Sequence, residues 1–99
     1  MAAYSITDVE VLDVDGFKRY RELAAPAVSR YGGRFLVRGA DPVAAEGEWP
    51  SGQRVNVIEF PSMEQLKAWY DSPEYAPARD VAKNALRRRL LFVGGVDPK

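Results

Sequence analysis

Segments with the two-residue period of a β-strand alternate along the chain with segments of helical period, and this order limits the folds available. Residues 4–12 ("YSITDVEVL") place Val9 and Val11 on one side and two acidic residues on the other. This alternation is typical of a half-buried strand. By the same criterion, further strands are predicted at residues 34–39, 54–60 and 89–96.

The first helical segment follows the first strand. Apolar side chains at helical spacing run from Phe17 to Tyr31, after Asp13 as an N-cap and before Gly32 as a helix stop. Pro26 lies inside this segment. Because proline lacks a backbone N–H and clashes with the preceding turn, we expect a kink or a break into two pieces.

The second helical segment is interrupted. Ser62 and Gln65 have the spacing of a capping box, so a helix should begin at Met63. Pro73 disfavours helical geometry in the residue before it and should end this helix. Helical spacing then resumes in residues 77–88.

The order strand, helix, strand, strand, helix, strand is that of the ferredoxin-like βαββαβ fold, an α+β fold with a four-stranded antiparallel sheet. A chain of 99 residues is the size of one domain, so residues 1–99 are assigned to a single domain. Both helical segments would cover one face of the sheet. The other face mixes apolar and charged side chains, which favours packing against a second copy and predicts a homodimer.

The composition excludes several classes of site. The chain has no cysteine and no histidine, which removes thiolate nucleophiles, Ser-His-Asp triads and imidazole-ligated haem, and we predict no cofactor and no metal. A net charge of zero argues against nucleic-acid binding, and the basic residues within 79–89 are interpreted as a solvated helix face. No apolar stretch is long enough to span a membrane, so a cytoplasmic location is predicted.

Four motifs carry a family resemblance. "RYGGRFLVRG", "EGEW", "RVNVIEFPS" and "AWYDSPEY" occur in this order, and the chain resembles over nearly its whole length the bacterial family called domain of unknown function 1330. The resemblance implies a dimeric α/β barrel, in which two ferredoxin-like protomers set their sheets face to face. Relatives in that superfamily include cofactor-free monooxygenases, lactone isomerases and a haem-dependent group. The haem group and some of the oxygenases use a histidine that this chain lacks.

Arg38 and Glu59 are candidate catalytic residues, because their strands should be neighbours and could place a charge pair in a cavity between the sheets. Arg38 would hold an anionic group, and a desolvated Glu59 could have the raised pKa that a general base needs. The face on which Glu59 lies stays open, because the strand register is unknown. A structural ion pair at a dimer interface is the favoured alternative.

Asp8 is a second candidate for proton transfer, and it shares a strand face with Glu10. Two carboxylates are too few for a metal site. Charged residues on the face of an antiparallel sheet are usually solvated or paired with a neighbouring strand, which is the alternative that we favour for this pair.

Four aromatic residues are candidates for a ligand pocket. Trp69, Tyr70 and Tyr75 could line its mouth and stack on a flat apolar ligand, and Trp49 could close over it or over a partner subunit. In the favoured alternative, Trp69 belongs to the core and the tyrosine hydroxyls hold the helix joint together.

The sequence therefore predicts a homodimeric protein that binds or converts a small, partly apolar molecule without a cofactor, in a cavity between sheet and helices. The sequence leaves open whether the protein is an enzyme. A non-catalytic binding or assembly module is the alternative.

Overall fold

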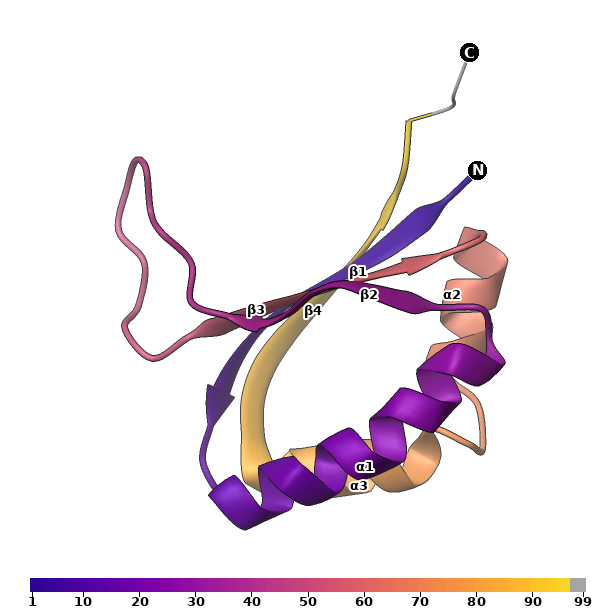
Figure 1. Cartoon of the computed structure of the whole chain (residues 1–99), viewed down its shortest axis with the longest axis horizontal. Helices are drawn as coiled ribbons and strands as arrows, with labels where there is room; N and C mark the ends of the chain where they lie inside the picture. The colour runs from indigo at the N-terminus through magenta and orange to yellow at the C-terminus, as the bar shows by residue number, and fades with distance from the viewer. Residues whose placement is uncertain (97–99) are drawn as a thin grey trace.

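The computed structural model describes residues 1–96 and shows a four-stranded antiparallel sheet with all helices on one side (Figure 1). The elements in chain order are β1 (Ala3–Val11), α1 (Val14–Arg30), β2 (Arg34–Ala40), β3 (Arg54–Phe60), α2 (Met63–Tyr70), α3 (Ala76–Ala85) and β4 (Leu86–Gly94). The strands lie in the order β2-β3-β1-β4. This is the predicted ferredoxin-like α+β fold, in which α2 and α3 together form the second helical segment.

The first helix, α1, begins as predicted, since the Asp13 carboxylate accepts a hydrogen bond from the backbone N–H of Asp15 at 3.2 Å. It then runs without interruption through Pro26, so the prediction of a break into two pieces is wrong. Residues on both sides of the proline, Ala24 and Val28 among them, are buried in the same core. Burial of both halves offsets the cost of about 3 kcal/mol for a proline inside a helix.

The cap of α2 confirms the predicted helix start. The Ser62 hydroxyl accepts a hydrogen bond from the backbone N–H of Gln65 at 3.1 Å. The Gln65 side chain does not return to Ser62, as a full capping box would require. It donates instead to the carbonyl oxygen of Tyr31 at 3.0 Å, so the start of α2 is tied to the end of α1.

The predicted boundary between the last helix and the last strand is wrong. The helix α3 ends at Ala85, and β4 begins at Leu86 and not at residue 89. The β1–β4 ladder extends to the pair Val11–Leu86, and these added backbone contacts favour the strand over the helix. The basic residues Arg87 to Arg89 therefore belong to a strand and not to a solvated helix face.

The sheet has two different faces. The inner face packs under the helices, and the β1 residues pointing there, such as Ser5 and Val9, are buried. On the open face, Ile6 lies opposite Val57 of β3 and Leu91 of β4. Ile6 and Leu91 remain 36% and 61% exposed, so the centre of this face is apolar and uncovered in the protomer.

The segment between β2 and β3, residues 41–53, is called the β2–β3 arm. In Figure 1 it extends away from the helices, beyond the end of the sheet. Every residue of the arm except Gln53 is exposed. No helix within residues 1–96 combines the length and the apolar character that a membrane crossing requires.

Candidate ligand-binding site

A cavity of about 160 Å³ lies between the inner face of the sheet and α1. All four strands contribute to its wall, together with α1 and one residue of α2. Apolar lining side chains include Val9, Phe17, Ala24, Val28, Phe35, Ile58, Trp69, Leu86 and Leu90. Polar lining side chains are Thr7, Tyr20, Arg21, Arg38, Arg54, Asn56 and Arg88. The cavity thus has an apolar interior with a few polar groups, as small-molecule sites usually do.

Four arginines line this cavity, whereas no aspartate or glutamate of residues 1–96 does. Arg21, Arg38 and Arg54 are exposed and Arg88 is half-buried, so the first three lie nearer the solvent. The Arg38 guanidinium lies 4.3 Å from the centre of the Phe35 ring, a cation–π contact. Within the described part of the chain, none of the four forms an ion pair.

Arg88 belongs to a cluster with two tyrosines. Its Nη1 donates to the Tyr20 hydroxyl at 2.9 Å and to the Tyr75 hydroxyl at 3.0 Å. The two hydroxyl oxygens are 2.7 Å apart, so one donates to the other. Tyr75 is fully buried, and this burial raises the pKa of its hydroxyl, which therefore keeps its proton.

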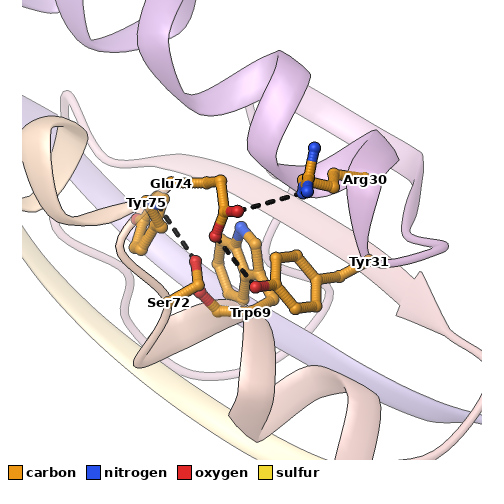
Figure 2. Close-up of polar contacts among 6 residues, drawn as sticks. All are labelled: Arg30, Tyr31, Trp69, Ser72, Glu74 and Tyr75. Atoms are coloured by element: carbon orange, nitrogen blue, oxygen red, sulfur yellow. Dashed lines mark hydrogen bonds and ion pairs between the residues drawn. The ribbon is translucent and has the colours of Figure 1, made fainter.

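The joint between α2 and α3 positions Trp69 and Tyr75 (Figure 2). The Ser72 hydroxyl donates to the carbonyl oxygen of Trp69 at 2.7 Å and accepts from the backbone N–H of Tyr75 at 3.1 Å. Glu74 accepts a hydrogen bond from the Tyr31 hydroxyl at 2.9 Å, which links the joint to the end of α1. The joint thereby holds Trp69 against the cavity and Tyr75 behind it.

The predicted ion pair between Arg38 and Glu59 is not formed. Glu59 lies on the open face, where it accepts from Arg34 Nε at 2.7 Å and from the Tyr4 hydroxyl at 3.2 Å. The β2–β3 register places Arg34 opposite Glu59, and a register shift farther along β2 brings Arg38 to the cavity. The hydrogen bond from Arg34 lowers the pKa of Glu59, whereas the predicted general base needed a raised one.

Asp8 also lies away from the cavity. Arg89 Nε donates to its Oδ2 at 3.0 Å across the β1–β4 ladder, and this hydrogen bond lowers the pKa of Asp8. Glu10 forms the next ion pair of the ladder with Arg87, at 3.0 Å. Both carboxylates are therefore paired with a neighbouring strand, which was the favoured alternative.

The four aromatic pocket candidates do not gather at one site. Trp69 lines the cavity, while Tyr75 lies behind the wall and Tyr70 is half-buried without lining it. Trp49 is 45% exposed and lines a separate hollow formed within the β2–β3 arm. In this protomer Trp49 does not close over the cavity.

The sequence analysis placed Arg38 at the site but none of the other polar lining residues, among them Tyr20, Arg88 and Asn56. Tyr20 was assigned only to the apolar stripe of α1, and Arg88 was assigned to the end of a helix. Alternation with Leu90 and Phe92 is the signal that could have placed Arg88 on the inner face of a strand. Asn56, whose Oδ1 accepts from the Gly39 backbone at 2.8 Å, gave no comparable signal.

Comparison with known proteins gives a family and a fold. The family described as domain of unknown function (DUF1330) matches residues 2–96. No curated protein matches the sequence. A protein of unknown function from Rhodopseudomonas palustris, RPA0582, is 18% identical with a TM-score of 0.75, over 98% of this chain and 84% of that one.

Two further structures show how widely the fold occurs. SnoaB from Streptomyces nogalater, described as a cofactor-independent oxygenase, is 12% identical with a TM-score of 0.69, over 98% of this chain and 95% of that one. The de novo designed protein Foldit4 is also 12% identical, with a TM-score of 0.64 over 97% of this chain and all of the other. A fold shared with a designed protein carries no activity by itself.

Proposed function

The chain belongs to the DUF1330 family, and on this premise we propose that it is a homodimeric protein that binds a small, partly apolar molecule in a cavity of each protomer, without a cofactor. The observation that carries the proposal is the cavity beneath α1, whose apolar wall is interrupted by a few polar groups. A cytoplasmic location and a bacterial origin are part of the same proposal.

The size of the cavity limits the ligand. Its volume of about 160 Å³ is close to that of an engineered apolar cavity of about 150 Å³ that binds benzene. The ligand therefore has about one ring, or an aliphatic group of that size, inside the wall. Trp69 forms part of this wall, while its indole nitrogen is buried out of reach of a molecule in the cavity.

The open face supports the homodimer. Its centre contains Ile6, Val57 and Leu91, and two of these side chains keep much of their surface exposed. Its charges are already paired between strands, Asp8 with Arg89 among them, so a second copy can cover the face without burying an unpaired charge. A twofold dimer needs such a self-complementary surface.

The positions of the acidic residues favour binding over acid–base catalysis. Among residues 1–96 no carboxylate lines the cavity, and Glu59 and Asp8, the sequence candidates for proton transfer, are on the other face. In this proposal Arg38 and Trp69 contact the ligand. Glu59 and Asp8 instead fix charge pairs on the face that meets the second copy.

A thermal-shift screen followed by titration tests the binding proposal. A ligand at 100 times its Kd stabilises the native state by about 2.7 kcal/mol, so single-ring acids, amides, lactones and quinones can be ranked by Tm. Ala24 lines the cavity and is buried, so Ala24→Leu should fill the space and abolish the shift. Ala68→Leu makes the same change at an exposed position of α2 and should leave binding intact. The proposal fails if no compound shifts the wild-type Tm, or if the shift survives Ala24→Leu in a folded variant.

A further inference from the structure

Arg88 is a half-buried cation whose contacts are neutral. Its Nη1 donates to two phenol hydroxyls, those of Tyr20 and Tyr75, and no carboxylate within residues 1–96 lies close enough to pair with it. A cation held away from water without a counter-charge is unfavourable. A guanidinium carries five N–H groups, so the Nε and Nη2 donors remain for a further partner.

Burial shows which of the two tyrosine hydroxyls donates the hydrogen bond to the other. The Tyr75 hydroxyl is fully buried and has only Tyr20 as an acceptor for its proton, because Arg88 is a donor without acceptor capacity. If the bond ran the other way, the Tyr75 proton would be buried without a partner, which costs about 1–3 kcal/mol. Tyr75 therefore donates to Tyr20, and Tyr20, which lines the cavity, keeps its own hydroxyl proton for a ligand.

The other charged groups of the wall have the same sign. Arg21, Arg38 and Arg54 lie at the more exposed part of the cavity, and no acidic side chain of the described residues balances them there. The neighbours of Arg88 in sequence, Arg87 and Arg89, have their acidic partners on the open face. The inner cavity is therefore a positively charged site with an apolar wall.

We propose that the ligand is a small monocarboxylate with an aromatic ring or a branched aliphatic group, and that its carboxylate accepts hydrogen bonds from Arg88 and Tyr20. This inference deepens the proposed function and rests on it. A planar carboxylate matches the fork of a guanidinium, which can donate to both of its oxygens. The apolar part of the molecule lies against Phe35 and Ile58, and the arginines nearer the solvent attract the anion.

Pairs of acids and amides of the same shape test the inference on the wild-type protein. Benzoate and phenylacetate are titrated by calorimetry against benzamide and phenylacetamide, with inorganic phosphate as a separate arm. Loss of a charge-assisted hydrogen bond costs about 10- to 100-fold in affinity, so each acid should bind at least tenfold more tightly than its amide. Phosphate should bind more weakly than either acid, because it cannot use the apolar wall.

Matched variants locate the carboxylate. Arg88→Met should weaken acid binding by about 10- to 100-fold and amide binding less, because the amide oxygen can accept from the guanidinium but carries no charge. Arg19→Met makes the same substitution at an exposed arginine of α1 that does not line the cavity, and it should change neither affinity. Tyr20→Phe removes the hydroxyl that accepts from Arg88 and Tyr75 and that donates to the ligand, and it should weaken the acids more than the amides. If Arg88→Met does not fold, the acid–amide comparison and Tyr20→Phe still decide.

The outcomes separate this inference from the proposed function. If the amides bind as tightly as the acids and Ala24→Leu abolishes both, the carboxylate site is wrong and small-molecule binding stands. If phosphate binds most tightly, or if Arg88→Met and Arg19→Met weaken the acids equally, the carboxylate site is also overturned. If neither acids nor amides bind, this inference falls, and the wider compound screen decides whether the proposed function falls with it.

Discussion

Leu91 lies near the centre of the open face and keeps 61% of its surface exposed in the protomer. Full burial of a leucine side chain stabilises by about 1.5–3 kcal/mol, so covering the exposed part contributes about 1–2 kcal/mol. A twofold dimer buries the residue twice. Leu91→Ala keeps the Cβ atom, so we expect a loss of about 2–3 kcal/mol, which raises the dimer Kd by about 30- to 150-fold.

Sedimentation velocity over a dilution series measures this change directly. The wild-type chain has a mass of 11.0 kDa, so its monomer and dimer are resolved. Leu12→Ala is the matched control, because Leu12 is 50% exposed but follows β1 and lies outside the sheet. It should leave the Kd unchanged.

Two results would refute the reasoning about the open face. The first is a wild-type protein that stays at 11 kDa at micromolar concentration. The second is a Leu91→Ala dimer as tight as the wild-type dimer, which would mean that the copies meet through another surface. In either case Glu59 and Asp8 would lose the role in dimer formation that is proposed for their ion pairs.

Three further predictions concern the stability of the protomer. Ser62→Ala removes the N-cap of α2 and should cost about 1 kcal/mol, which lowers the Tm by about 4–8 °C; an unchanged circular-dichroism melting curve would contradict the cap. Tyr75→Phe leaves Tyr20 and Arg88 with one bond fewer and should cost about 1–3 kcal/mol in urea unfolding. Arg34 depresses the pKa of Glu59 in the folded state below its ordinary value of 4.5. The Arg34–Glu59 pair therefore stabilises the fold above pH 4.5, and this stabilisation is lost as the pH falls through the folded-state pKa. Glu59→Gln should therefore flatten the loss of urea stability below pH 4.5, and equal slopes would show that the pair does not contribute.

The elements of the fold could be predicted because their signals are local. Alternation of apolar and polar residues predicts the strands, and the spacing of Ser62 and Gln65 predicts the start of α2. Both signals lie within the few residues that form the element. The unbroken α1 was not predictable in this way. Whether Pro26 breaks a helix depends on the burial of both flanking segments against a sheet that is distant in sequence.

The site was less predictable because it depends on register. Arg38 and Glu59 are on neighbouring strands, as expected, but the shift in the β2–β3 ladder places them on opposite faces. Arg88 follows a helix whose basic residues are spaced four apart, so local spacing favoured continuing that helix. The β1–β4 ladder, formed with residues far away in the chain, overrides that preference.

The alternation along β4 also leaves that strand a single acceptable alignment. Sliding it by one position would bring Arg87 and Arg89 under the helices and expose Leu90 and Phe92 to water. Misaligned pairing is thereby disfavoured during folding. For an engineer, Leu86, Arg88 and Leu90 can be redesigned to change the lining of the cavity, while Arg87 and Arg89 are kept to preserve the ion pairs of the open face.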